Sequence, residues 1–279
     1  MKVGFIGQGY IGKNYADDFE ARGYEVVRYS LEEPFVDNKE KIAECEVVFI
    51  AVPTPTTMDG FDASTVKSAV QLVGEGKIAV IKSTIIPGTT EIIQNSRLDV
   101  TVLNSPEFLS EKTATYDTAH PTLNIIGIPK EAPEHRKAAE LVMTLLPNAP
   151  LKMVCKSVEA EIFKYAHNIN GYTQILLFNI LYDVSKKFGA DWDVVQQAIK
   201  GDPLMVDTYA NPIHKSGRGA GGNCFIKDFA AFANLYEGRV GDNEGVKVLR
   251  ALEEKNKQLL NDSKKDLNIL EVVYGKSTD

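Results

Sequence analysis

The feature that most constrains the fold lies within the first dozen residues. A short apolar run at residues 3–6 leads directly into G-x-G-x-x-G at residues 7–12. Residues 14–22 then have helical character, and residues 25–29 have the character of a second strand. In this strand–turn–helix order the glycines permit a tight turn and let a pyrophosphate approach the N-terminus of the helix. We therefore expect a Rossmann-type dinucleotide-binding domain.

Strand and helix signals alternate through the rest of the first half. Residues 63–73 have helical periodicity, and polar or proline-rich residues follow most of the strands. Four further buried-strand patterns lie at residues 46–52, 77–82, 100–104 and 123–128. This alternation predicts an α/β fold with a mostly parallel, doubly wound sheet, which binds ligands beyond the carboxyl ends of its strands.

The end of the second strand leaves the choice of cofactor open. A carboxylate at this place normally holds the adenosine ribose hydroxyls. Here the strand ends in Arg28, Tyr29 and Ser30, and the first acids come later, at Glu32 and Glu33. A hydroxyl beside an arginine is a pattern that tolerates a 2′-phosphate, so both NAD and NADP remain possible.

The second half has a different character, because helical periodicity replaces the alternation. Residues 158–188 form one long helical pattern without proline, and shorter helical patterns follow. We expect a dinucleotide-binding domain at residues 1–156, an all-α domain at 157–265 and a short tail at 266–279, with at most one strand at 268–274. Long helices of this kind commonly form dimer interfaces, so a homodimer through the helical domain is expected.

A thiol in a glycine-rich setting is the first candidate for chemistry. Cys224 follows a glycine-rich stretch at 217–222 in which every residue except Arg218 is small, and Lys227 and Asp228 follow the thiol at three and four residues. A helix beginning near Cys224 would place all three side chains on one face. The thiolate, which is the nucleophile, is favoured at a helix N-terminus beside a cation. The alternative is a buried, inert cysteine after a glycine turn.

A second candidate lies on the long helix. Lys164 and Asn168 are four residues apart, so both side chains share one face of an otherwise apolar pattern. Together they can address one small polar ligand. The alternative is a solvated polar stripe.

Composition excludes several classes of function. A net charge of −7 without a basic run argues against a nucleic-acid partner. No apolar run approaches the roughly 20 residues needed to span a bilayer, and no signal peptide precedes the first strand, so we expect no membrane association. The three cysteines lie far apart without a CxxC pair, and the four histidines lack metal-ligand spacing, so we expect no metal and a reducing, cytoplasmic compartment.

Taken together, these stretches resemble the UDP-glucose/GDP-mannose dehydrogenase family, in the family's order from residue 1 to about residue 260. The matching motifs are G-x-G-x-x-G at 7–12, VPTPT at 52–56, KST at 82–84, SPEFL at 105–109, EAE at 159–161 with Lys164 and Asn168, and GGNCFIKD at 221–228. The last motif is highly specific.

The resemblance implies a two-step, four-electron oxidation of a nucleotide sugar's primary alcohol to a uronic acid. Cys224 would attack the intermediate aldehyde, and the resulting thiohemiacetal would be oxidised to a thioester that water hydrolyses. Lys164 and Asn168 would stabilise negative charge on the substrate oxygen. The family's remaining catalytic roles, in proton transfer and in holding water, would fall to Asp228, Thr84, Glu107 and Glu111.

The resemblance also implies which residues bind the cofactor and the sugar. Residues expected to bind NAD, or alternatively NADP, are Gly7, Gly9, Tyr10, Ile11, Gly12, Ser30, Thr54, Thr84, Glu111 and Lys227. Residues expected to bind the nucleotide sugar are Phe108, Leu109, Lys164, Asn168 and Gly221.

The chain departs from the family pattern in four places. Ser30 replaces the usual acid, and the link at residues 31–45 is short. An arginine expected before the thiol motif is replaced around Leu204, and Arg218 or Lys215 is a candidate to take its role. We expect no third domain that would grip the nucleotide, and therefore expect about half of the usual contacts to the nucleotide sugar to be absent.

Two alternatives follow from these departures. The first is a 3-hydroxyacid or 6-phosphogluconate-type dehydrogenase, which shares the Lys–Asn pair, performs one oxidation and needs no thiol. The second is a non-catalytic or partner-dependent subunit whose nucleotide-recognising partner is another chain.

Overall fold

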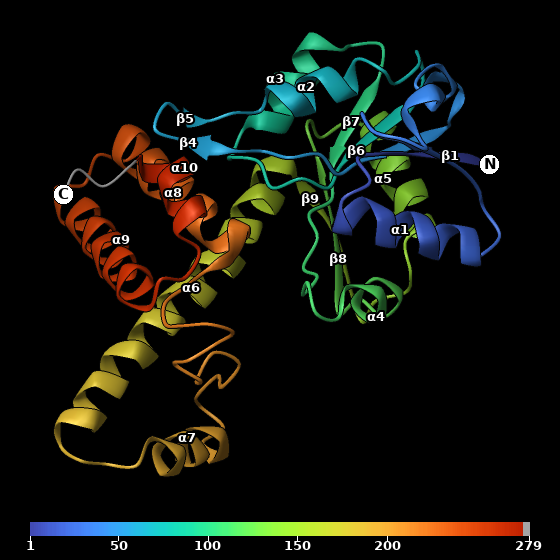
Figure 1. The fold of residues 1–279 in the computed structure, drawn as a ribbon. Coiled ribbons are helices and arrows are strands. Elements are labelled where there is room, and N and C mark those ends of the chain that lie inside the picture. The colour runs from blue at the N-terminus through green and yellow to red at the C-terminus, as the bar shows by residue number, and fades with distance from the viewer. Residues whose placement is uncertain (276–279) are drawn as a thin grey trace. The chain divides into compact units, whose positions relative to one another are not determined.

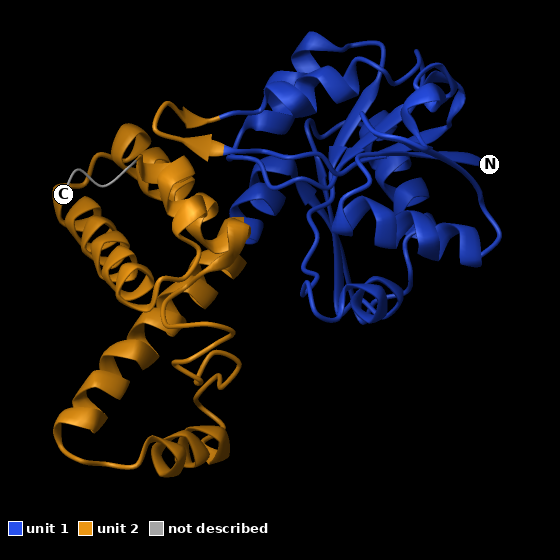
Figure 2. Ribbon diagram, viewed as in Figure 1, with its two compact units in different colours: residues 1–55, 62–164 blue, residues 56–61, 165–279 orange. Residues whose placement is uncertain are grey.

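The computed structural model describes residues 1–275 and contains two compact units (Figures 1 and 2). Unit 1 comprises Met1–Pro55 and Asp62–Lys164, and unit 2 comprises Thr56–Phe61 and Tyr165–Asp279. The division therefore falls inside helix α6 (Ser157–Lys187) rather than after residue 156. A short antiparallel hairpin, β4 (Thr56–Thr57) and β5 (Gly60–Phe61), belongs to unit 2 although the first half of the chain contributes it.

A seven-stranded sheet organises unit 1, and every adjacent pair of strands is parallel except β7 and β8. The predicted mostly parallel, doubly wound sheet is therefore confirmed. Its order is β2 (Glu25–Tyr29), β1 (Lys2–Ile6), β3 (Val47–Ile50), β6 (Ile78–Ile81), β7 (Thr101–Asn104), β8 (Leu123–Ile128) and β9 (Leu151–Lys156).

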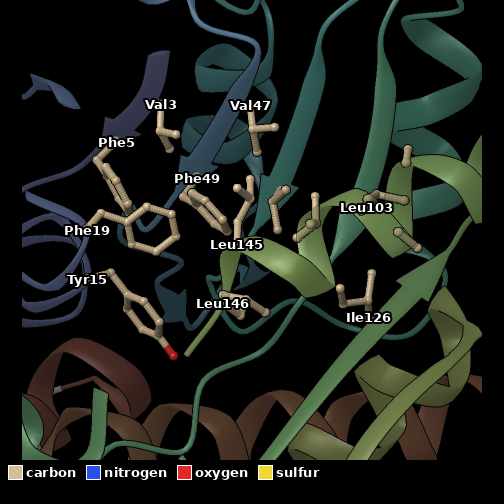
Figure 3. Packing of buried hydrophobic residues seen from close by; sticks show 14 of the residues in the cluster. Val3, Phe5, Tyr15, Phe19, Val47, Phe49, Leu103, Ile126, Leu145 and Leu146 are labelled. Atoms are coloured by element: carbon tan, nitrogen blue, oxygen red, sulfur yellow. The ribbon is translucent and has the colours of Figure 1, made fainter. Parts of the chain in front are cut away.

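Helices cover the sheet on both sides. The main core packs α1 (Tyr10–Ala21) and α5 (Pro133–Leu145) against one face, with Phe5 and Phe49 stacked at 5.2 Å between ring centroids (Figure 3). On the other side lie α2 (Ser64–Val70) and α3 (Thr89–Ser96) (Figure 1). The 3₁₀ helices Val36–Asn38 and Glu40–Glu44 follow β2, and α4 (Ala114–Ala119) precedes β8.

The sequence does not predict strand β9, because this strand lies at the edge of the sheet. Its side chains are exposed or half-buried throughout, Lys152 interrupts its apolar residues, and Lys156 ends the strand. A strand of this kind lacks the continuous apolar run that marks the buried central strands.

Unit 2 is built from helices around α6, as predicted. They are α7 (Trp192–Gly201), α8 (Gly222–Arg239), α9 (Asn243–Ser263) and α10 (Leu267–Tyr274). The stacked rings of Tyr172 on α6 and Phe229 on α8, with centroids 3.9 Å apart, lie in the core that joins α6, α8 and α9.

Within the expected tail, residues 267–274 form helix α10 and no strand, and residues 276–279 lie outside the described residues. Leu270 and Val273 are buried against Ile226, Ala230 and Leu260 of α8 and α9. The sequence LNILEVVY is rich in β-branched residues, but its apolar side chains recur every three to four residues. Because no sheet edge of unit 2 pairs with this segment among the described residues, a helix satisfies its backbone hydrogen bonds locally.

Candidate active site

Two positions in the turn between β1 and α1 must be glycine because neighbouring backbone atoms pack closely against them. Gly7 has φ +90°, a conformation that side chains rarely adopt, and a Cβ there would collide with the carbonyl of Ala51. A Cβ on Gly12 would collide with the carbonyl oxygen of Gly7. Both positions therefore require glycine so that the turn can form and α1 can pack against it.

Gly9 faces open space instead. Apart from Gly9 itself and its two chain neighbours, no described residue has an atom within 4 Å of a Cβ built on it. Gly9 is also the N-cap of α1 and provides no capping side chain, so the amides of Tyr10, Ile11 and Gly12 begin the helix without a side-chain cap. An unfilled cradle in front of a helix N-terminus suits the pyrophosphate of a dinucleotide.

The end of β2 favours NAD over NADP. The guanidinium of Arg28 donates to both carboxylate oxygens of Glu20, at 3.0 and 2.7 Å, and pairs with Asp17 at 2.7 Å. The hydroxyl of Ser30 donates to the backbone carbonyl of Glu32 at 2.8 Å. Since two carboxylates already balance the charge of Arg28, this corner is poorly suited to a 2′-phosphate.

Buried charges gather beyond the carboxyl ends of β6 and β7. The ammonium of Lys164 donates to the backbone carbonyl of Glu107 at 2.7 Å and to its carboxylate at 3.1 Å, and both side chains are at most 6% exposed. The other carboxylate oxygen of Glu107 accepts the amide of Leu109 at 2.7 Å. The aromatic ring of Phe108 lies 5.3 Å from Lys164 Nζ. The alternative of a solvated stripe is therefore wrong for Lys164.

Lys82 lies near the Lys164–Glu107 pair. The sequence indicates it only as the first residue of the KST motif at 82–84 and assigns it no role of its own. Its ammonium donates to Ser105 Oγ at 3.2 Å and lies 4.4 Å from the centroid of the Tyr15 ring. Burial lowers the pKa of Lys82 to about 7; Glu107 opposes this shift and Lys164 adds to it. The one available signal was a lysine directly after a buried apolar strand.

Glu161 holds the loop that follows Thr84. Its carboxylate accepts the backbone amides of Gly88 and Thr90, at 2.6 and 2.9 Å, and the hydroxyl of Thr90 at 2.6 Å. It therefore serves as a distant cap for the N-terminus of α3, where Gly88 offers no side chain. Burial raises the pKa of Glu161, and these hydrogen bonds oppose the rise.

The other predicted residues of unit 1 lie in the loops after the strands. Thr84 is half-buried after β6, Thr54 is buried after β3, and Glu111 is exposed beyond β7. Their positions place them at the carboxyl edge of the parallel strands, where the sequence predicted ligand binding.

Unit 2 contains the thiol and its neighbours. Helix α8 begins at Gly222 with Gly221 as its N-cap, so Cys224 lies in the first turn, as predicted, and is half-buried. One turn later, Asp228 accepts the amide of Asn168 at 2.6 Å and the ammonium of Lys227 at 2.5 Å. Asn168 and Asp228 are both at most 5% exposed, so Asn168 does not belong to a solvated stripe either.

The predicted catalytic residues therefore form two hydrogen-bonded groups, one within each unit. Glu107 and Lys164 pair in unit 1, whereas Asn168 and Asp228 pair in unit 2. Lys164 and Asn168 are one turn apart on the continuous helix α6.

Two classes of feature are not found in the part of the chain that the structure describes. No group of three or more His, Cys, Asp or Glu residues is arranged to hold a metal ion. Within residues 1–275, no helix combines the length and the apolar character needed to cross a membrane.

Comparison with known proteins gives two matches to one family. Residues 33–145 match the NAD binding domain of the UDP-glucose/GDP-mannose dehydrogenase family, and residues 158–258 match its central domain.

Individual relatives agree with this family. UDP-glucose 6-dehydrogenase AglM of Haloferax volcanii is 28% identical over 91% of this chain and 73% of its own length. The putative UDP-glucose 6-dehydrogenase YtcA of Bacillus subtilis is 32% identical over 69% of this chain, which spans 46% of that relative.

Solved structures share the fold. A UDP-glucose dehydrogenase from Pyrobaculum islandicum superposes with a TM-score of 0.78 at 27% identity, over 91% of this chain and 68% of that one. A 3-hydroxyisobutyrate dehydrogenase from Mycobacterium tuberculosis has a TM-score of 0.72 at 14% identity, over 98% of both chains, which shows a shared fold alone.

The two family matches lie in sequence order and together take in most of both units, and the first of them is to a domain that binds NAD. The chain therefore belongs to the UDP-glucose/GDP-mannose dehydrogenase family, a family of NAD-dependent oxidoreductases.

Proposed function

We propose that the chain oxidises the primary alcohol of a nucleotide sugar resembling UDP-glucose to the uronic acid through a covalent intermediate on Cys224. The observation that carries this proposal is the position of Cys224 in the first turn of α8, one turn before the buried Asn168–Asp228 pair. Relatives named UDP-glucose 6-dehydrogenase support the choice of substrate class.

When bound, NAD accepts one hydride in each of the two oxidations. Gly7, Gly9 and Gly12 with the first amides of α1 hold its pyrophosphate, and Ser30, Thr54 and Lys227 add further contacts. Thr84 and Glu111 lie in loops after the strands and contribute to the same site.

In the first oxidation the alcohol loses a hydride and its hydroxyl proton to become the aldehyde. Lys164 and Asn168 stabilise the negative charge that develops on the sugar oxygen. Glu107 keeps the Lys164 ammonium in place through the hydrogen bond to its carboxylate.

In the second oxidation the thiolate of Cys224 adds to the aldehyde carbon, and the oxygen takes up a proton to give a thiohemiacetal. Loss of a hydride and of that proton leaves a thioester. One water, positioned by Asp228 with Thr84 and Glu111, adds to the thioester carbonyl and releases the thiolate and the acid. Per sugar, two NAD are reduced, one water is consumed and the protons lost from the hydroxyl groups and the water pass to solvent.

We further propose a cytoplasmic homodimer that contacts through the helical domain. Large apolar side chains recur every three to four residues on one face of α6 and remain exposed within the chain: Leu177, Ile180, Leu181 and Val184, followed by Phe188 just after the helix. An apolar stripe of this length supports an interface between two copies. Residues Phe108, Leu109 and Gly221 complete the proposed contacts to the sugar.

The decisive experiment measures how many NAD are reduced per nucleotide sugar consumed. UDP-glucose and a panel of other nucleotide sugars are tested with NAD and with NADP, using the wild type, Cys224→Ser and the control Cys155→Ser. Cys155 is also a half-buried thiol, but it lies on edge strand β9. We expect two NADH per sugar in the wild type and the control, and no uronic acid from Cys224→Ser.

Two other outcomes would replace this function. One NADH per sugar, unaffected by Cys224→Ser, would indicate the hydroxyacid type of dehydrogenase, with which the chain shares its fold. Binding of NAD without turnover of any sugar would indicate a partner-dependent subunit.

A further inference from the structure

The glycine-rich loop before Cys224 is held by side chains from the end of α9 and the turn that follows it. The side-chain amide of Asn256 accepts the backbone N–H of Ala220 at 2.7 Å and donates to its carbonyl at 3.0 Å. The ammonium of Lys265 donates to the carbonyl of Gly219 at 2.9 Å. The segment at residues 263–266, here called the α9–α10 corner, therefore grips the backbone of the loop together with Asn256.

Two further contacts extend this grip on either side. The hydroxyl of Ser263 accepts the amide of Arg218 at 3.1 Å. The carboxylate of Asp266 accepts the amide of Gly222 at 2.8 Å. Residues 218, 219, 220 and 222 are thus all bound through their backbones by side chains at least 36 residues away in sequence.

The same contacts explain why the loop is rich in glycine. A Cβ on Gly217 would lie 2.5 Å from Ser263 Oγ, and one on Gly219 would lie 2.9 Å from Asn256 Oδ1. A Cβ on Gly221 would collide with the Asp266 carboxylate. The loop therefore needs glycine at these positions so that the α9–α10 corner and Asn256 can pack against its backbone.

The corner itself adopts an unfavourable backbone. Lys264 and Asp266, neither of them glycine, both have φ of +54°, the left-handed region that costs free energy for residues with a side chain. Between them, Lys265 is only 5% exposed although it carries an ammonium group. Such a segment persists only where surrounding contacts enforce it.

Asp266 also determines where α8 begins. The N-cap of this helix, Gly221, has no side chain, so a residue 44 positions away supplies the carboxylate for the first helical amide. Cys224 lies two residues after that amide. A shift of the helix start would therefore move the thiol with it.

We propose that Asn256, Ser263, Lys265 and Asp266 are positioning residues for Cys224, which fix the glycine-rich loop and the first turn of α8 so that the thiol is held in its reactive place. This inference rests on the proposed role of Cys224 as nucleophile. Misplacing a reacting group by about 1 Å can lower a rate by about a hundredfold, so a loosened loop slows turnover.

Two substitutions of one residue separate the hydrogen bond from backbone strain. Asp266→Gly tolerates the left-handed backbone but lacks the acceptor, whereas Asp266→Asn tolerates that backbone and keeps an acceptor oxygen. Lys265→Met and the milder Ser263→Ala test the other contacts, so that the inference stays testable if one variant fails to fold. Lys247→Met, at an exposed lysine of α9, is the control.

The readouts are hydrogen exchange of the peptide containing residues 217–224 and the kcat and KM for the sugar. We expect Asp266→Gly and Lys265→Met to speed exchange about tenfold or more and to lower kcat about tenfold or more, with KM changed less than about twofold. Asp266→Asn and the control should behave like the wild type. NAD affinity should change less than kcat, because all the residues proposed to bind NAD except Lys227 lie in unit 1.

Two results would overturn the proposal. Unchanged exchange in Asp266→Gly, Lys265→Met and Ser263→Ala would mean that the corner does not hold the loop. Faster exchange with unchanged kcat would mean that the grip does not serve the thiol. If Cys224→Ser retains full activity, the proposed function fails instead, while the exchange measurement still tests the grip by itself.

Discussion

At the scale of single residues, Lys82 shows how strongly burial changes a charge. Its side chain is 3% exposed and shares its surroundings with Lys164 and the carboxylate of Glu107. Two ammonium groups near one buried carboxylate cannot both be favourable, and burial lowers the pKa of Lys82 to about 7.

This shift predicts a pH dependence of stability. Below pH 7 Lys82 is protonated in both the folded and the unfolded chain. Between about pH 7 and its usual pKa of 10.5, the unfolded chain binds the proton and the folded chain does not, so the free energy of unfolding gains a contribution that rises with pH. Lys82→Met should remove a slope of up to about 1.4 kcal/mol per pH unit.

Urea unfolding at several pH values between 7.5 and 9.5, in the wild type, Lys82→Met and the exposed control Lys112→Met, measures this slope. The difference between the wild type and Lys82→Met isolates the lysine from other titrating groups. Parallel profiles for these two proteins would show that Lys82 stays protonated when folded.

At the scale of elements, helix α6 stabilises two different parts of the chain, the loop after β6 and the core of unit 2. Its first turns hold the loop after β6 through Glu161, and its middle turns form the core of unit 2 through Tyr172 and Leu176. From the sequence, Glu161 is an acid near the N-terminus of α6, where a negative charge interacts favourably with the helix dipole. In the structure its partners are instead the amides of Gly88 and Thr90, more than 70 residues away.

Glu161→Ala should therefore destabilise the chain by about 2–3 kcal/mol, since it leaves two backbone amides and a hydroxyl without their acceptor. Thermal unfolding and urea titration measure this cost. The exposed neighbour Glu159 hydrogen-bonds the amide of Lys156 at 2.9 Å, and Glu159→Ala serves as the control, with an expected loss of about 1 kcal/mol or less. Equal losses in both variants would contradict the capping role of Glu161.

At the scale of the whole molecule, the exposed apolar stripe on α6 predicts a dimer. Leu177 and Val184, each 51% exposed, lie two turns apart on the same face. Replacing both with Glu should convert the dimer to a monomer in sedimentation experiments, because two buried charges would face the partner copy. Unfolding of the monomer should change little, since both side chains are exposed within the chain.

The matched control for that experiment is Lys186→Glu, which adds negative charge on the opposite face of the same helix. A wild type that sediments as a monomer at micromolar concentration would contradict the proposed dimer. A double variant that remains dimeric would place the interface elsewhere.

Local patterns in the sequence determined much of this protein. The order of strand, glycine turn and helix predicted β1 and α1, continuous apolar runs predicted the central strands, and periodicity predicted α6 and shorter helices after it. These features depend on residues close together in the chain, because glycine conformations and apolar spacing act locally. The candidate residues Cys224, Asp228, Lys164 and Asn168 could be recognised for the same reason.

Only the tertiary structure decided the features that depend on distant neighbours. Whether residues 267–274 became a strand or a helix depended on α8 and α9, against which α10 buries Leu270 and Val273. The low pKa of Lys82 comes from its burial in the folded chain, to which the nearby Lys164 adds, and the setting of the thiol depends on Lys265 and Asp266. Burial and long-range hydrogen bonds arise only once folding has brought residues distant in the sequence together, so a local sequence pattern cannot predict them.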